Sequence, residues 1–515
     1  DFGNCYSFLS YISDFDGKTR LGGNVHDLLP SGLNEGIPSV FFYSKAAGTL
    51  CGETAVRGRA KPVQNRINRL KRHLGETMTL DGREISYDEA ITEVIQHCVR
   101  SANKKLQSGW QMTTNEIALS YPATYTSAQR QRLIELAEKA SLADGTQVHV
   151  SGTIAEPAAA GLDYLSRFGS DKETTVLVYD LGGGTFDLAL VALYPKGRTN
   201  GDGDYYYDIL AVDGLEDVGG GEFDEIMYQL IEQKLQVPLN PSHKAALRAE
   251  AEKIKKDLTF DAYADAEVLY NNEYLTVRVT REEFETASRE LLMRTIEATK
   301  KMFERHSNQK PETIILTGGA SQMPMVKRAL EEAFPEYKGD EMKHKEDKIQ
   351  ISNPSRAIAD GAARYGTAEA MNDIAEKAEA VSVVQTRVGY DLGIRFYHSV
   401  DDESGYISTY IPAGTPIPYQ AAYQNSTTLH EDQRYSGFTV YEANKAHPDS
   451  EQVAEDYTEI MKVSLDHGRE VPKGTRNESR LCIDKLGVLT IEAREADYPE
   501  KPIKSTVELK NLSKS

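Results

Sequence analysis

The sequence predicts an α/β protein of two related halves, followed by an all-β sandwich. Two apolar runs rich in β-branched residues flank a glycine-rich turn, Asp180-Leu-Gly-Gly-Gly-Thr185. A shorter copy of that pattern, Asp1-Phe-Gly3, stands at the start of the chain and indicates an internal repeat. Beyond residue 390 the chain changes to short apolar runs separated by Gly, Pro and Asn, which is typical of a sandwich.

Composition bounds the possible functions. The chain has 515 residues, enough for about three domains, and a formal net charge of −20, so a nucleic acid backbone would be repelled. We therefore expect no nucleic acid partner. No apolar run is long enough to span a membrane, so no membrane association is expected. The cysteines have no paired spacing, which favours a reducing compartment, the cytoplasm, and no structural zinc; they are Cys5, Cys51, Cys98 and Cys482.

The glycine-rich turn has the residues of a phosphate-binding hairpin. Thr175 to Tyr179 and Leu188 to Tyr194 read as strands, so the turn joins strand to strand. Glycines allow backbone N–H groups to surround an anion, Asp180 can hold hydrated Mg²⁺, and Thr185 can donate its hydroxyl to phosphate. Walker and dinucleotide loops open a helix instead and are excluded. Three glycines alone would equally fit an ordinary hairpin, whereas a phosphate hairpin in each half is typical of actin-like ATPases.

The order of five motifs resembles that of the seventy-kilodalton heat-shock chaperone family, the DnaK type, over nearly the whole chain. The motifs are Asp1-Phe-Gly-Asn-Cys-Tyr-Ser7, Tyr121-Pro-Ala-Thr-Tyr-Thr-Ser-Ala-Gln-Arg-Gln131, Ile154-Ala-Glu-Pro-Ala-Ala-Ala160, Asp180-Leu-Gly-Gly-Gly-Thr-Phe-Asp187 and Thr317-Gly-Gly-Ala-Ser-Gln-Met-Pro-Met325. The resemblance implies an actin-like ATPase domain in residues 1–380, a linker in 381–389 and a β-sandwich peptide-binding domain in 390–515.

The resemblance also implies the catalytic residues and cofactors. ATP or ADP would bind with Mg²⁺ and K⁺, and the Mg²⁺ would be held through water by Asp1, Glu156 and Asp180. Lys71 would hold the attacking water beside the γ-phosphate, with Thr185 nearby. Charge pattern alone offers plainer explanations. Lys71 would lie in the last turn of a helix predicted over 67–74, and Glu156 at the first turn of another, where helix dipoles favour such charges.

The nucleotide would contact residues from both halves. The implied phosphate contacts are Gly3, Asn4, Cys5, Tyr6, Gly182, Gly183, Gly184, Gly219 and Gly220, and the implied adenosine contacts are Glu252, Lys255, Lys256, Thr259, Gly318, Gly319, Ala320 and Gln322. By helical spacing alone, residues 252–256 form a solvated face opposite Leu247, Ala251, Ile254 and Leu258. Asn4 and Cys5 replace two threonines of the family. Gln322 replaces an arginine that stacks on adenine, so we expect weaker nucleotide binding.

Two further segments of the ATPase region are assigned by pattern. Ser127 is expected to cap the helix that contains Arg130, and Pro122 and Arg130 match positions that carry the family's nucleotide signal outward. A helix over 368–380 would end the region. The linker, Ser382 to Thr386, lacks the leucine-rich run of the family, which puts interdomain coupling in question.

The sandwich is expected to form the client site. Its predicted strands are Ile407 to Ile411, Gly437 to Tyr441, Ile460 to Leu465, Arg480 to Ile483, Val488 to Ala493 and Ser505 to Leu509. The resemblance places Ile394, Phe396 and Tyr397 on one side of a groove, with Leu429 and Phe438 opposite; the alternative is that these residues are core. Ser436 stands where the family has an aliphatic residue, so we expect weak, fast-exchanging binding of apolar peptides.

These observations predict an ATP-hydrolysing chaperone that binds exposed apolar segments of unfolded polypeptides. A J-domain co-chaperone and a nucleotide-exchange factor are the expected partners. Three alternatives stay open: a non-cycling relative acting as exchange factor or holdase, an actin-like filament protein and a sugar kinase. Asp1 lies where a strand should already be ending, so preceding residues are expected. The chain stops at Ser515 without a helical lid, which indicates a lidless member or a cut chain.

Overall fold

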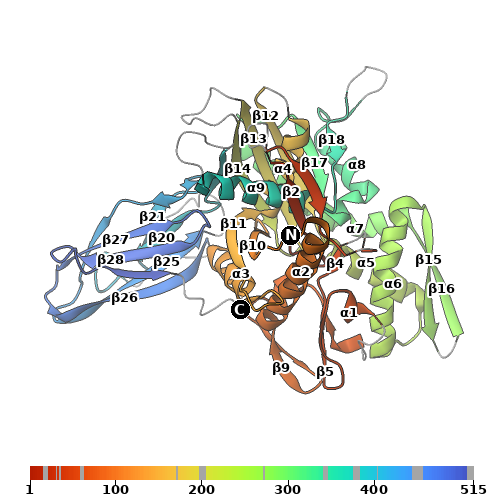
Figure 1. Ribbon diagram of the computed structural model, residues 1–515, viewed down its shortest axis with the longest axis horizontal. Helices are drawn as coiled ribbons and strands as arrows, with labels where there is room; N and C mark the ends of the chain where they lie inside the picture. Colours follow the sequence, from red (N-terminus) through yellow and green to blue (C-terminus); the bar gives the residue numbers. More distant parts are fainter. Residues whose placement is uncertain are drawn as a thin grey trace.

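The computed structural model (Figure 1) describes most of the chain. The described residues are 1–15, 21–30, 32–33, 36–57, 63–169, 172–195, 205–270, 273–339, 346–374, 383–402, 404–443 and 456–506. Within them, no helix is both long enough and apolar enough to cross a membrane.

The first half of the ATPase region surrounds the long helix α2 with short strands. The elements are β1 (Tyr6–Ser7), β2 (Ser10–Ser13), β3 (Asn24–Asp27), β4 (Ile37–Pro38), β5 (Phe41–Ser44), β6 (Gly48–Cys51), α1 (Glu53–Val56), η1 (Val63–Asn65), β7 (Arg66–Ile67), η2 (Leu70–His73), β8 (Thr77–Leu80), β9 (Arg83–Ser86), α2 (Tyr87–Trp110), β10 (Glu116–Tyr121), α3 (Ser127–Lys139) and β11 (His149–Ala155). β10 and β11 pair in parallel, and β2 pairs with β3 antiparallel. The apolar face of α2 forms one core with parts of α3, β10 and β11.

Two local predictions for this half are wrong. Residues 67–74 do not form a helix, because Arg69 adopts a left-handed conformation with φ 55° that interrupts it. The 3-10 turn η2 follows and buries Leu70 and Lys71. The cap of α3 is Thr126, not Ser127. Its Oγ1 accepts a hydrogen bond from Gln129 N–H, and the Gln129 side chain accepts one from the Thr126 N–H, which completes a capping box.

The second half is built on a twisted sheet whose central strand enters the glycine-rich turn. Its elements are α4 (Glu156–Phe168), β12 (Thr174–Leu181), β13 (Phe186–Pro195), β14 (Tyr205–Leu215), α5 (Gly220–Leu235), α6 (Pro241–Phe260), β15 (Tyr263–Tyr270), β16 (Glu273–Thr280), α7 (Arg281–Arg305), β17 (Thr313–Thr317), η3 (Gly319–Gln322), α8 (Pro324–Ala333), β18 (Ile349–Ile351) and α9 (Ala357–Ile374). The strands run in the order β18-β17-β12-β13-β14. β12 is apolar because both faces of the sheet are covered.

The sheet confirms the predicted hairpin. β12 and β13 are antiparallel partners, and their register places Asp180 opposite Asp187 at the turn. The predicted amphipathic helix is α6, and Leu247, Ala251, Ile254 and Leu258 are all buried in it. The helix predicted over 368–380 is α9, which begins earlier, at Ala357; residues 375–380 lie outside the described residues.

The C-terminal region is a sandwich of two antiparallel sheets. Its strands are β20 (Leu392–Phe396), β21 (Tyr406–Ile411), β22 (Pro416–Ile417), β23 (Tyr419–Gln420), β24 (Gln424–Thr427), β25 (Gln433–Ala443), β26 (Tyr457–Val471), β27 (Arg476–Ile483), β28 (Leu489–Glu495) and β29 (Ile503–Thr506). One sheet has the order β21-β20-β25-β26, and the other contains β23, β24, β27, β28 and β29. The predicted strands lie in these elements, except that residues 507–509 lie outside the described residues.

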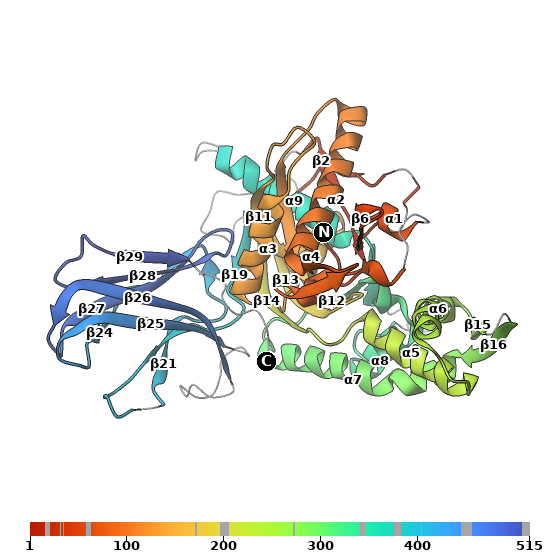
Figure 2. The ribbon, with the colours of Figure 1, turned by 90° about the horizontal axis from the view of Figure 1, so that it is seen from below.

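The sandwich is docked on the ATPase region. In Figures 1 and 2 it lies beside α3 and β11, at the opposite end from α6, β15 and β16. Ser127 donates its N–H and hydroxyl to Glu442 at 3.2 and 3.1 Å, and Thr153 donates to the Leu486 carbonyl at 2.8 Å. Arg130 donates to the Gly487 carbonyl, so it contacts the sandwich directly.

The predicted linker forms a strand. β19 (Val383–Arg387) pairs in parallel with β14 of the ATPase sheet and antiparallel with β22 of the sandwich; residues 381 and 382 lie outside the described residues. Arg387 reinforces the junction with two bonds to Asp208, at 2.7 and 2.5 Å. The linker lacks leucines, but backbone hydrogen bonds hold it to both the ATPase sheet and the sandwich.

Replacing Arg387 by Ala should weaken this junction. The Asp208 side chain is 7% exposed, and removal of the guanidinium would cost about 1–3 kcal/mol, because a charged acceptor would lose its bidentate donor. We expect a lower melting temperature by calorimetry and faster proteolysis near residues 383–390. The control is Arg434→Ala, which removes an exposed pair with Asp466 inside the sandwich. Equal behaviour of the two variants would contradict a stabilising role for Arg387.

Candidate nucleotide and client sites

The two glycine-rich loops face each other. A Cβ on Gly183 would lie 2.5 Å from Cys5 Sγ, and one on Gly184 would overlap the Asn4 side chain. Asn4 and Cys5, which replace the family's threonines, therefore fill the space between the two hairpins. Side chains at Gly183 and Gly184 would separate them, which explains why glycine is needed at both positions.

The start of α5 contacts the same turn. Gly220 N–H donates to the Gly182 carbonyl at 2.8 Å, and Gly221 N–H donates to the Gly183 carbonyl at 2.9 Å. A Cβ on Gly219 would overlap the Gly184 backbone. Three glycine-rich segments thus meet: the start of α5 contacts the second turn through its backbone, and the first loop contacts that turn through the Asn4 and Cys5 side chains.

Buried carboxylates gather beside the hairpins. Asp180, Asp187 and Glu156 are 3%, 1% and 6% exposed. Lys71, which is also buried, pairs with Glu156 and donates to the Phe2 carbonyl at 2.7 Å. Burial, with repulsion from Asp187 and Glu156, raises the pKa of Asp180 well above its usual value, and Lys71 offsets part of that effect. Asp1 accepts a bond from the Ser120 hydroxyl at 3.4 Å.

Asp187 is a site residue that sequence reasoning missed. Its Oδ2 accepts a bond from the Thr185 hydroxyl at 2.6 Å, and its Oδ1 accepts one from the Ala123 N–H at 2.7 Å. Burial, followed by the charge of Glu156, raises the pKa of Asp187. The signal was available, because strand pairing across a short hairpin places the last carboxylate of the motif opposite Asp180.

The donor set fits a hydrated Mg²⁺. Asp180 Oδ1 is buried and accepts no hydrogen bond from the described residues, so it has a free acceptor for a metal-bound water. No group of three or more His, Cys, Asp or Glu side chains in the described part converges closely enough to hold a metal alone. That geometry suits an ion that keeps several waters and takes its other ligands from phosphate.

Arginines cross from the first half to the second. Arg72 pairs with Glu222 at 2.5 Å and also donates to the Gly184 carbonyl, while Arg69 pairs with Asp224 at 3.4 Å. Sequence reasoning assigned no role to these arginines. Their signal was the basic run that continues from Lys71, together with the carboxylates that follow Gly221.

The predicted adenosine residues are brought only partly together. Lys255 is buried against Asp224 at 2.6 Å and donates to the Gly220 carbonyl, whereas Lys256 pairs with Glu252 at 3.0 Å. Lys256 Nζ also lies 5.9 Å from the centre of the Tyr6 ring, which joins α6 to the first loop. Lys255 therefore points inward, so only part of the predicted face at residues 252–256 is solvated.

The second adenosine segment lies against the end of β12. Gly318 has φ 79°, and a Cβ there would overlap Asp180, so glycine is required. Gln322 Nε2 lies 3.5 Å from the Gly319 carbonyl, and Ala320 is 7% exposed. On α6, the Thr259 carbonyl accepts a hydrogen bond from Arg281. No contact between the described side chains joins Thr259 to Gln322. Sequence reasoning did not assign a role to Ser321. Its hydroxyl accepts a hydrogen bond from the Leu181 N–H at 3.1 Å.

Comparison with known proteins identifies the family. The family model described as Hsp70 protein matches residues 77–514. The chain belongs to the Hsp70 family. It is 28% identical to the chaperone protein DnaK of Thermosipho africanus over 480 residues, which cover 89% of this chain and 72% of that protein. It is 27% identical to DnaK of Thermotoga petrophila over 522 residues, covering 92% and 80%. The chain is therefore an ATP-dependent chaperone and an ATPase with an actin-like domain and a β-sandwich.

The predicted client residues of this Hsp70 protein mostly line one groove. Phe396, Tyr397, Leu429, Ser436 and Phe438 surround a cavity of about 660 Å³ between the edges of the two sheets. Ile394 does not line it. It is fully buried in the sandwich core. The alternative considered for Ile394 is thus the correct one.

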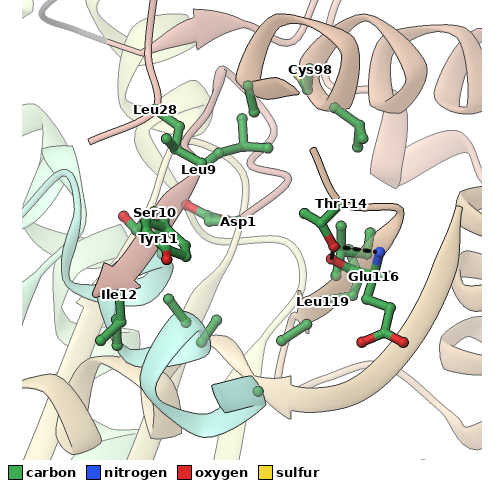
Figure 3. Close-up of a pocket in the computed structure, with 18 of the residues that line it drawn as sticks. Asp1, Leu9, Ser10, Tyr11, Ile12, Leu28, Cys98, Thr114, Glu116 and Leu119 are labelled. Atoms are coloured by element: carbon green, nitrogen blue, oxygen red, sulfur yellow. Dashed lines mark hydrogen bonds between the residues drawn. The ribbon is translucent and has the colours of Figure 1, made fainter. Parts of the chain in front are cut away.

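A second cavity of about 370 Å³ lies between the first half and α9 (Figure 3). Leu9 and Ser10 to Ile12 of β2 lie on one side and Thr114, Glu116 and Leu119 on the other, with Leu28 and Cys98 above. Asp1 lines it, but Lys71, Glu156 and Asp180 do not. Ala359, Ala362 and Gly366 of α9 also line it, so the cavity lies where the first half meets α9.

Replacing Arg72 by Ala should loosen the nucleotide cleft. The change removes the bonds to Glu222 and the Gly184 carbonyl, which hold the second hairpin and α5 to the first half. We expect fluorescent ADP to dissociate several-fold faster in stopped-flow measurements, since three charge-assisted bonds are lost. The matched control is Arg83→Ala, which removes an ion pair with Glu89 within the first half. An unchanged dissociation rate would show that the arginine does not hold the cleft.

Proposed function

We propose that this Hsp70 protein hydrolyses Mg-ATP at the junction of its two hairpins and couples hydrolysis to binding apolar segments in the sandwich groove. The observation that carries the proposal is the buried Lys71–Glu156 pair beside Asp180 and Asp187. Buried charges of this kind are costly, and they are typically retained where they position reacting groups.

Each residue of the cluster has a role in the proposed reaction. Lys71 holds the attacking water and offsets charge that develops on the γ-phosphate. Glu156, Asp180 and Asp1 would hold the hydrated Mg²⁺. The Thr185 hydroxyl, which donates to Asp187 in this structure, would turn to donate to phosphate. Bound Mg²⁺ supplies charge neutralisation at the phosphates. Backbone N–H groups of residues 3–6, 183, 184 and 219 would hold the phosphates, with K⁺ as a second cation. Gly182 and Gly220 would shape the loop, since their N–H groups donate to the Thr185 and Gly182 carbonyls.

The adenosine moiety is proposed to lie between α6 and η3. Lys256, Glu252 and Thr259 would face one side, and Gly318, Gly319, Ala320 and Gln322 the other; Lys255 contributes by fixing Asp224 and Gly220. Gln322 would place an amide against adenine, where an arginine would place a guanidinium. We therefore expect weaker nucleotide binding than an arginine at this position would provide.

The wider organisation follows from the same proposal. Residues 1–380 form the ATPase domain, 381–389 the linker and 390–515 the client domain. Chaperones of this class work with co-chaperones, and we propose a J-domain protein and a nucleotide-exchange factor as partners. The described cysteines are free thiols, which suits the reducing cytoplasm. Contacts of α3 with Glu442 and Gly487 support coupling between the two sites.

A non-cycling relative is the second candidate. The ion pairs that Arg69 and Arg72 make across the cleft favour retention of nucleotide, and such a relative would bind nucleotide with little turnover. A filament protein and a sugar kinase are less well supported, because neither activity requires a client sandwich. Measurement of steady-state ATPase with and without an unfolded client protein separates the candidates, since only a cycling chaperone is stimulated.

Lys71→Ala should abolish most of this turnover and leave nucleotide binding largely intact. Removal of one pre-placed charge typically costs about 10²–10³ in rate. The measurement is phosphate release at saturating ATP, with and without a reduced, unfolded client. The control is Lys104→Ala, an exposed lysine on α2. Turnover unchanged in Lys71→Ala would refute the mechanism, and absence of client stimulation in the unaltered chain would favour the non-cycling relative.

Gln322→Arg should tighten ADP binding. A guanidinium over the adenine face would add a cation–π contact, worth roughly threefold to fivefold in affinity at a partly exposed site. Titration calorimetry measures the change directly. The control is Gln107→Arg, which adds the same charge at an exposed position of α2. Equal or weaker binding in Gln322→Arg would reject the proposed place of the base.

A further inference from the structure

The floor of the client groove at Ser436 is polar, and its hydroxyl is already hydrogen-bonded. Ser436 Oγ accepts bonds from Asn477 Nδ2 at 2.9 Å and from Gln433 Nε2 at 3.2 Å, and it lies 3.0 Å from His467 Nε2. Ser436 is 5% exposed, so it offers a ligand neither a free hydroxyl nor the apolar area of an aliphatic side chain. We therefore expect the walls of the groove to determine which segments bind.

The walls of the groove carry positive charge from both sheets. None of the described lining residues is Asp or Glu, although the whole chain has a net charge of −20. Arg395 lies on β20 of one sheet, and Arg476 is the first residue of β27 of the other. His398 and His430 line the groove as well. The groove is thus a basic site in an acidic protein.

Arg476 differs from the arginines elsewhere in the sandwich. Four of them pair with carboxylates: Arg434 with Asp466, Arg469 with Glu495, Arg480 with Glu492 and Arg494 with Glu478. Arg476 is exposed, and its guanidinium makes no hydrogen bond or ion pair with any described residue. An unpaired guanidinium in the wall of a groove is available to a carboxylate of a ligand, which it can bind through two parallel N–H groups.

Carboxylates close to the groove along the chain are engaged by backbone groups. Asp402 accepts N–H bonds from His398 and Gly405 at 3.0 and 2.9 Å. Glu431 accepts one from the Lys473 N–H at 3.2 Å. Neither carboxylate lines the groove or pairs with Arg476, so this arginine has no acidic partner in the described part of the sandwich.

The chemistry of the walls decides which side chains fit. A lysine or arginine of a ligand would be repelled by the basic lining, and a neutral polar side chain would gain a hydrogen bond without the attraction of opposite charges. A carboxylate gains both. Phe396, Tyr397 and Phe438 line the same groove, so a fitting segment also has apolar residues.

We propose that the groove selects extended client segments in which acidic residues adjoin an apolar centre, with Arg476 binding one of the carboxylates. The apolar residues pack on Phe396, Tyr397 and Phe438, and main-chain hydrogen bonds hold the segment. The proposal rests on the groove being the client site of the proposed function, and names the charge preferred there. The attraction acts at contact distance, whereas repulsion from the rest of the acidic chain acts over distances that physiological salt screens.

The test is fluorescence anisotropy at physiological ionic strength with three labelled peptides. They share one leucine-rich centre and carry Glu, Gln or Lys on both sides of it. On the unaltered chain, the Glu peptide should bind roughly fivefold more tightly than the Gln peptide, as expected for one well-formed exposed charge pair. The Lys peptide should bind most weakly. These comparisons need no variant.

Variants of Arg476 then assign the preference. Arg476→Gln should remove most of the preference for Glu over Gln, and Arg476→Glu should reverse it in favour of the Lys peptide. The matched control is Lys462→Gln, which removes the same charge from an exposed position on β26 outside the groove and should retain the preference. Thermal unfolding shows that each variant is folded.

The possible failures are distinguishable. Equal or tighter binding of the Gln or Lys peptide by the unaltered chain overturns the acidic preference and leaves the proposed function standing. A preference for Glu that is undiminished in Arg476→Gln overturns the role given to Arg476. Absence of binding for all three peptides overturns client binding itself, and the preference with it.

Discussion

The burial of several carboxylates beside one lysine is the constraint on which the nucleotide site depends. Asp180, Asp187 and Glu156 are nearly inaccessible. Burial, followed by repulsion from neighbouring carboxylates, raises the pKa of Asp180 and of Asp187. Such a cluster is tolerated only where fixed donors and a bound cation offset the charge. Lys71, the Ala123 N–H and the Thr185 hydroxyl supply the fixed donors. In the proposed function, phosphate and Mg²⁺ bound between the glycine-rich loops would supply the rest.

The same cluster is connected physically to the client domain. Asp187 binds the backbone at Ala123, and the Tyr125 hydroxyl donates to the Lys71 carbonyl at 3.1 Å, so the turn before α3 is fixed by the nucleotide site. α3 then holds the sandwich through Ser127 and Arg130. Backbone pairing of β19 with β14 attaches the sandwich a second time. A change at the hairpins can therefore alter the docking surface through a few hydrogen bonds, without leucines in the linker.

Sequence reasoning succeeded where local physics determines the structure. The Asp180 hairpin, α6 and the sandwich strands follow from periodicity and glycine placement, which tertiary contacts do not override. It failed at residues 67–74, where Arg69 takes a left-handed conformation that no local pattern requires. Ile394 was ambiguous because alternation shows that a strand has two faces but not which face a partner sheet covers. Arg72 and Asn477 could not be assigned from sequence, since their partners are distant along the chain and act only after folding.

The departures from the family pattern are matched by their neighbours in space. Asn4 and Cys5 fill the contact with Gly184 and Gly183. In the groove, a serine at position 436 alone would bury an unmatched hydroxyl, but Asn477, Gln433 and His467 satisfy it. Glu495 in turn requires His467 and Arg469, and hydrogen bonds from them lower its pKa although burial alone raises it. A network in which each polar group depends on the next is destabilised by the loss of any one member. The floor of the groove is therefore a matched polar surface and not an apolar one with a single polar defect.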